Sequence, residues 1–120
     1  MTVSANFAFL GEHAPALMRI GAQAELHFVE NPDIALIRLR QFGEVLAQGL
    51  AARMGLEDSP QETQFRRLER LRESRSVPRS VHDLFHQLRL AGNGAVHELD
   101  GNHRQALANL KIARELGIWF

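Results

Sequence analysis

Residues 32–54 carry apolar side chains on nearly every side of a helix, and this stretch limits the possible folds more than any other. Asn31-Pro32-Asp33 is a typical helix start, and Gly55 is a residue favoured just beyond a helix end. The remaining polar stripe is narrow and consists of Asp33, Arg40, Gln41, Glu44 and Gln48. Such a helix needs neighbours over most of its surface. The sequence therefore predicts an all-α bundle of about five helices, with helix 32–54 central and with Phe42 and Leu46 buried.

The other four helices follow from apolar spacing and from residues typical of helix starts. We expect them at about 15–29, 60–74, 79–97 and 102–120. Helix 60–74 has only three apolar anchors, so it should lie on the outside of the bundle; they are Phe65, Leu68 and Leu71. Asn102 and Gln105 form a pair typical of a capped helix start.

At 120 residues the chain has the size of a single domain, 1–120. It has no cysteine, which excludes disulfides and cysteine-ligated metals. No apolar run approaches the roughly 18 residues that span a bilayer, and the first residues do not resemble a secretory signal. We therefore expect a cytoplasmic protein without a membrane partner. Because Trp119 and Phe120 close the sequence with no stop signal, we expect an N-terminal fragment of a longer subunit. These two side chains should have few neighbours in a minimal bundle, so we also expect a homodimer or a docking surface.

The net charge of zero conceals one basic segment, residues 66–79, with six arginines and two glutamates. Arg66, Arg67 and Arg70 are the candidates for contact with a nucleic-acid backbone. The alternative is a solvated helix whose arginines pair with glutamates three or four residues away, such as Glu62 and Glu69. Because no aromatic side chain is interleaved for base stacking, the residues by themselves favour the second interpretation.

Helix 79–97 should continue through Gly92 and Gly94, because its apolar positions keep their helical spacing across both glycines. The glycines then mark places where a neighbouring segment packs closely. On this continuous helix a polar strip flanks the apolar face within an arc of roughly 80°. Its members are His82, His86, Arg89, Asn93 and His97.

Two chemistries are possible along this strip. His82 and His86 have the spacing of a helical zinc site, but His97 lies three turns away, too far to be the third ligand, so we predict no metal site. Asn93 and His97 could position a substrate and transfer a proton. The alternative, which the residues favour, is a polar cluster that ties this helix to its neighbours.

The stretches FLGEHAPALMRIGAQAELHFVENPDIALIRLRQFGEVLAQGLAARMG and DLFHQLRLAGNGAVHE resemble the N-terminal helical domain of type I restriction enzyme R subunits and related DEAD/DEAH-box helicases. That domain is similar to the HEPN superfamily. LIRLRQFGE and LRLAGNGAVH are the most specific parts of the resemblance. It implies a non-catalytic accessory domain of an ATP-dependent, DNA-translocating endonuclease, which mediates assembly or nucleic-acid contact. The partners would be the remaining domains or subunits of the restriction complex, and DNA.

The HEPN ribonuclease motif is an arginine followed four to six residues later by a histidine, often with a polar residue such as asparagine beside the arginine. His97 and Asn93 match, but Gly92 stands at the arginine position, and seven residues separate Arg89 from His97. The resemblance thus leaves only a remnant of the motif, and we predict a catalytically silent fragment with a structural His97. It needs no cofactor, since ATP and magnesium would serve the parent's motor and nuclease domains. The alternatives are an active metal-independent ribonuclease and a free-standing interaction domain of toxin–antitoxin type.

Overall fold

All regular secondary structure in the described part of the chain is helical, and this part contains no strand. This computed structural model describes residues 6–12, 14–56, 62–75, 77–98 and 102–120. The elements are the 3-10 helix η1 (Ala8–Leu10) and five α-helices: α1 (Pro15–His27), α2 (Pro32–Arg53), α3 (Gln64–Glu73), α4 (Arg79–Glu98) and α5 (His103–Trp119). The predicted all-α architecture is confirmed, although α3 begins later than expected. The likeness to HEPN domains stays a prediction.

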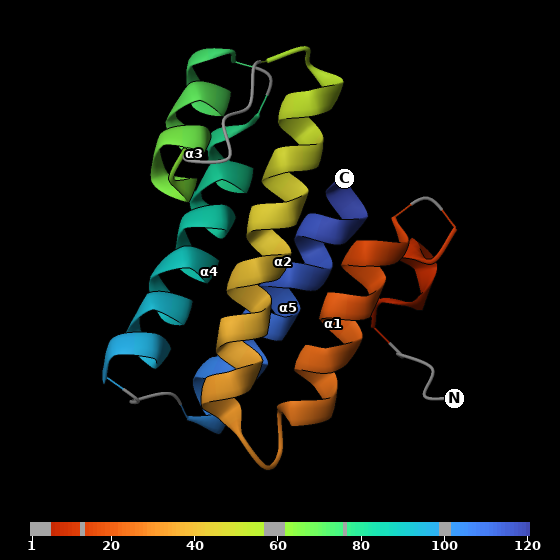
Figure 1. Cartoon of the computed structure of the whole chain (residues 1–120), viewed down its shortest axis with the longest axis vertical. Coiled ribbons are helices and arrows are strands. Elements are labelled where there is room, and N and C mark those ends of the chain that lie inside the picture. The colour runs from red at the N-terminus through yellow and green to blue at the C-terminus, as the bar shows by residue number, and fades with distance from the viewer. Residues whose placement is uncertain (1–5, 13, 57–61, 76, 99–101) are drawn as a thin grey trace.

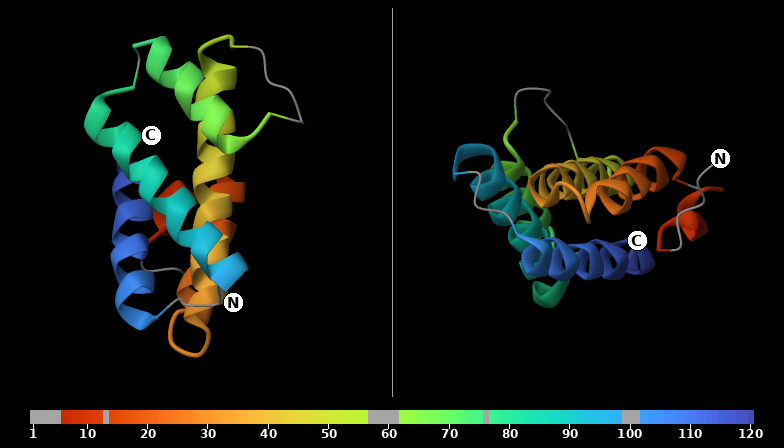
Figure 2. Two further views of the ribbon diagram at one scale, coloured as in Figure 1. Left: turned by 90° about the vertical axis from the view of Figure 1, so that its left-hand side faces the viewer. Right: turned by 90° about the horizontal axis from the view of Figure 1, so that it is seen from below.

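Helix α2 occupies the centre of the bundle. It contacts each of the other α-helices, lying between α1 and α4 with α5 behind it (Figures 1 and 2). Phe42 and Leu46 are fully buried, which confirms the prediction from the sequence. Around them the core gathers side chains from η1 and from all five helices, including Phe7, Phe85 and Leu116. The nearly all-round apolar pattern of α2 is therefore the pattern of a helix enclosed by its neighbours.

The helix ends follow the sequence signals. Gly55 has a φ of 70°, which suits glycine, and its N–H donates to the Ala52 carbonyl at 3.2 Å. Asn102 caps α5, since its Oδ1 accepts from the Gln105 N–H at 2.9 Å. Asn31 holds the N-cap position of α2, as the sequence predicts, although its side chain makes no capping hydrogen bond. Pro32, with its fixed φ, begins this helix without it.

Helix α4 runs unbroken through Gly92 and Gly94, as predicted. A Cβ atom placed on Gly92 would lie 2.4 Å from the Cβ of Arg40 on α2, closer than two carbon atoms can pack. The backbone of α4 thus meets a side chain of α2 at this residue. Gly92 is required by packing between two helices and does not mark a turn.

Helix α3 lies on the outside but is anchored differently from the prediction. Leu68 and Leu71 are buried, whereas Phe65 is 48% exposed, so its expected anchoring role is wrong. Arg67 is buried in its place, with 3% of its surface exposed. At 100° per residue, Phe65 lies roughly 110° from the centre of the face formed by the other three side chains. Its ring therefore falls at the edge of the packed face.

The last two residues differ in their surroundings. The Arg53 guanidinium lies 4.1 Å from the centre of the Phe120 ring, and Phe120 packs against the core. The expectation that it has few neighbours is therefore wrong, while Trp119 remains partly exposed. Homodimer formation stays a prediction. Among the helices described, none combines the length and apolar character needed to cross a bilayer.

Candidate functional site

The polar strip of α4 lies at the border of the core, as predicted. His82 is buried, and His86, Arg89 and Asn93 are each half-buried. The side chain of His97, the last member of the strip, lies outside the described residues. The four described side chains make contacts with α3 and α2, and these contacts limit what each can do.

Arg89 is turned toward α3. Its guanidinium lies 5.3 Å from the centre of the Phe65 ring, and its Nε donates to His86 Nδ1 across a long 3.4 Å. The rings of Phe65 and His86 are 5.9 Å apart. Arg89 is therefore held between an exposed aromatic ring and a histidine.

Asn93 is joined to α2 by Arg40, a residue that the sequence analysis assigned to a plain polar stripe. Arg40 Nη1 donates to Asn93 Oδ1 at 3.2 Å, and Arg40 Nε lies 3.5 Å from Glu44 Oε1. This agrees with the interpretation of Asn93 as a tie between helices. The spacing of Arg40 and Glu44 is visible in the sequence, but the contact to Asn93 depends on how close α2 and α4 approach at Gly92.

A pocket of about 350 Å³ opens where α2, α3 and α4 meet, beside these groups. Phe65 and Arg89 line it together with two polar side chains from the start of α3 and two from the neighbouring helices; the four are Thr63, Gln64, Glu44 and Asn93. The exposed Phe65 ring here lies directly before the arginine-rich segment in sequence. The aromatic side chain that the sequence analysis did not find among the arginines is therefore present at their edge.

The three candidate arginines of α3 differ in accessibility. Arg66 is exposed, whereas Arg67 is buried and donates to Gln64 Oε1 at 3.2 Å. Arg70 donates to Glu62 Oε2 at 2.5 Å, and Arg67 Nε lies 4.0 Å from the other oxygen of the same carboxylate. Glu62 thus lies before α3 and pairs with arginines five and eight residues away, whereas the expected spacing was three or four residues. Of the three, Arg66 faces solvent most fully.

A second set of arginines surrounds a larger pocket at the turn between α3 and α4. This pocket has a volume of about 590 Å³, and the exposed side chains of Arg72, Arg75 and Arg79 line it. Arg72 also donates to Glu69 at 3.1 Å, the three-residue spacing expected from the sequence. The other lining residues are Val77, His82, Asp83 and His86. The exposed positive charge of residues 66–79 is thus concentrated at this end of the molecule.

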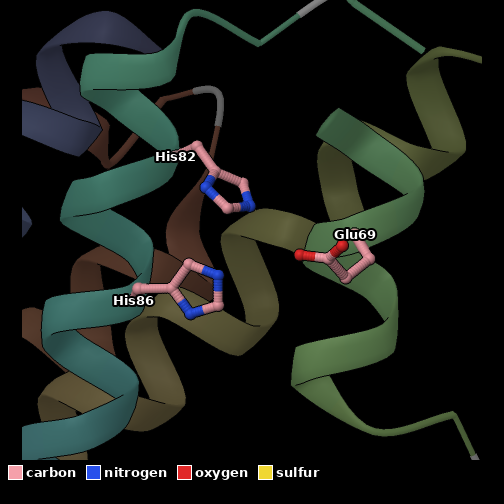
Figure 3. Close-up of side chains that lie close together, drawn as sticks. All are labelled: Glu69, His82 and His86. Atoms are coloured by element: carbon pink, nitrogen blue, oxygen red, sulfur yellow. The ribbon is translucent and has the colours of Figure 1, made fainter. Parts of the chain in front are cut away.

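His82 and His86, which both line this pocket, stack edge to face with ring centres 4.5 Å apart. Both rings turn toward the Glu69 carboxylate of α3 (Figure 3). One donor atom from each of the three residues lies within 4.8 Å of the other two. Burial lowers the pKa of His86, and the nearby His82 and Arg89 lower it further, so the neutral ring is favoured. From the sequence, only His97 was a candidate third partner for the two histidines, and Glu69 was not predicted.

Comparison with known proteins places these features in context. The family described as "Domain of unknown function (DUF4145)" matches residues 22–116. The chain is also similar to the type I restriction enzyme EcoKI endonuclease subunit of Escherichia coli strain K12, with 31% identity over 120 residues. That alignment takes in the whole of this chain but 10% of the relative, so the chain spans about a tenth of the length of that protein. No solved structure matches the chain.

Proposed function

We propose that this chain, which belongs to the DUF4145 family, is a non-catalytic accessory domain of a type I restriction R subunit or a related helicase. The observation that carries the proposal is the 31% identity to a restriction endonuclease subunit along the entire chain. In this proposal residues 1–120 form one HEPN-like domain in the cytoplasm. The partners are the remaining domains or subunits, where ATP and magnesium would act.

Within this role we assign the domain a contact with the nucleic-acid backbone. Four exposed arginines support the assignment: Arg66, Arg72, Arg75 and Arg79. Three of them line one pocket, and the exposed ring of Phe65 adds a surface on which a base could stack. Arg67 does not belong to this surface because it is buried. Arg70 is half-buried and paired with Glu62, whereas the side chain of Arg72 is 61% exposed despite its pairing with Glu69. Phosphate contacts of this kind position a protein on nucleic acid without reading its sequence.

The proposal of a non-catalytic domain rests on the surroundings of the motif remnant. An arginine at position 92 has no room, because even a Cβ atom there would collide with Arg40. Arg40 itself bonds to Asn93 and lies beside Glu44. Arg89 is directed at Phe65 and His86. The nearby cations are thus engaged with protein side chains, which supports a silent remnant.

The test is a titration of fluorescein-labelled duplex DNA with the full chain, followed by fluorescence anisotropy at several salt concentrations. Four phosphate contacts predict a slope of about −3.6 in log K against log salt, or roughly a hundredfold loss of affinity between about 50 and 200 mM. The double variant Arg66→Gln/Arg79→Gln should make the slope shallower by about two, since each phosphate contact contributes about one to its magnitude. Sequence preference should be slight.

A matched control is the double variant Arg104→Gln/Arg114→Gln, which removes two exposed arginines from α5 and changes the net charge equally. It should bind like the unmodified chain. Equal losses in both double variants would contradict a localised surface. If no binding is detected even at low salt, the domain serves assembly alone, and the nucleic-acid assignment is wrong.

A further inference from the structure

We propose that Glu69, His82 and His86 form a binding site for a divalent transition metal, with zinc as the best match. The two histidines lie one turn apart on α4, and the carboxylate comes from α3, which packs beside it (Figure 3). One donor atom from each residue lies within 4.8 Å of the others. Neither the restriction role nor the nucleic-acid contact requires this site, so the inference stands apart from them.

The burial of His82 points to a ligand. Only 6% of the surface of His82 is exposed, and its Nε2 atom has no hydrogen-bond partner among the described residues. Buried nitrogen atoms without a partner are rare in folded proteins because they lose their hydration and gain nothing. Both rings turn toward Glu69 (Figure 3), so a metal placed between them would satisfy this atom.

The donor set selects the class of metal. Two imidazole nitrogens and one carboxylate oxygen are ligands typical of zinc sites that keep a fourth position for water or another ligand. Magnesium and calcium prefer oxygen ligands and do not fit two histidines. Tetrahedral zinc at about 2.0–2.1 Å from each donor requires donor atoms roughly 3.4 Å apart. The observed arrangement within 4.8 Å therefore needs only a small side-chain adjustment.

The surroundings allow this adjustment. Glu69 accepts from Arg72 through one carboxylate oxygen, Oε2, and the second oxygen can turn to the metal. Arg89 donates to His86 Nδ1 across 3.4 Å, a long and weak contact. Coordination through the other ring nitrogen puts a proton on Nδ1, so this contact must be released. Arg89 can then keep its position over the Phe65 ring.

His82 and His86 line the same pocket as Arg72, Arg75 and Arg79, so these arginines would lie near a bound metal. These cations oppose metal binding through space, but they favour an anion as the fourth ligand. A metal here would also join α3 to α4 beyond the turn that connects them. A bound metal would therefore stabilise the packing of α3 against α4 at the end of the bundle where Arg72, Arg75 and Arg79 lie.

The experiment uses the full chain with its affinity tag removed and its metals stripped with EDTA, then dialysed. Isothermal titration with zinc chloride should show one saturable site per chain, and zinc should raise the melting temperature. Cobalt chloride should give the visible absorption bands of a tetrahedral site. Glu69→Gln and His86→Gln should each weaken zinc binding by at least tenfold. His82 is left unchanged because replacing a buried ring could unfold the chain.

The matched controls are His27→Gln, a half-buried histidine on α1, and Arg89→Gln. His27→Gln should bind zinc like the unmodified chain. Arg89→Gln should tighten binding several-fold, since a glutamine oxygen can accept a hydrogen bond from His86 Nδ1–H, which an arginine cannot. Circular dichroism checks that each variant is folded. Zinc affinity unchanged in the folded Glu69→Gln and His86→Gln variants, or no saturable binding by the unmodified chain, would overturn the proposal.

Discussion

Replacing Gly92 with alanine tests the packing that holds α2 against α4. In the middle of a helix this change normally stabilises a protein by about 1 kcal/mol, because glycine is a poor helix former. Here the added Cβ would lie 2.4 Å from the Cβ of Arg40 and 3.0 Å from its Cγ and Cδ. The Arg40 Cβ is fixed to the backbone of α2 and cannot swing away. The two helices must therefore move apart.

The size of the effect follows from that movement. Carbon atoms pack at about 3.5 Å or more, so α2 and α4 must separate locally by about 1 Å. Overpacking of this kind lowers the free energy of unfolding by about 1–3 kcal/mol. Because the Arg40 Cβ cannot move away, we expect a cost of about 3 kcal/mol here. The higher helix propensity of alanine offsets about 1 kcal/mol of this cost, so the free energy of unfolding should fall by about 2 kcal/mol in total. For a chain of this length that lowers the melting temperature by roughly 8 °C.

The assay is urea unfolding followed by circular dichroism, with Gly49→Ala as the control. Gly49 also lies within α2, but a Cβ there would meet the Phe120 ring at 3.5 Å, an ordinary contact. Gly49→Ala should therefore raise the free energy of unfolding by up to about 1 kcal/mol. A Gly92→Ala protein as stable as the unmodified chain would refute the close approach at this residue and reopen position 92 to a side chain.

Two further predictions concern the charged cluster and the motif remnant. Glu62→Gln should lower the free energy of unfolding by about 2–3 kcal/mol, because buried Arg67 and half-buried Arg70 both lose their carboxylate partner. The control Glu73→Gln, at an exposed position, should change the free energy of unfolding by less than about 0.5 kcal/mol. Equal effects of the two variants in urea titrations would contradict the pairing. The unmodified chain should not cleave RNA without metal, and His97→Ala should cost about 1–3 kcal/mol of stability through the loss of a polar contact. Cleavage that disappears in His97→Ala without a change in melting temperature would establish the ribonuclease alternative.

The sequence by itself determined the helices, because helix formation depends on local spacing and on residues close in the chain. The all-round apolar pattern of 32–54 located the central helix, and the unbroken apolar spacing around Gly92 correctly predicted one continuous helix. The half-buried polar strip of α4 followed from the same geometry, since a helix fixes which residues share a face. These features need no knowledge of what packs against them.

Only the tertiary structure decided which polar groups meet. Arg40 reaches Asn93 because α2 and α4 approach at Gly92, and Glu69 faces His82 because α3 packs beside α4. These partners are 53 residues apart in the first case and 13 in the second, and no local pattern links them. Phe65 was misplaced for the same reason. Whether an apolar residue at the edge of a helix face is buried depends on the exact rotation of that helix against its neighbours, and packing of the whole core sets that rotation.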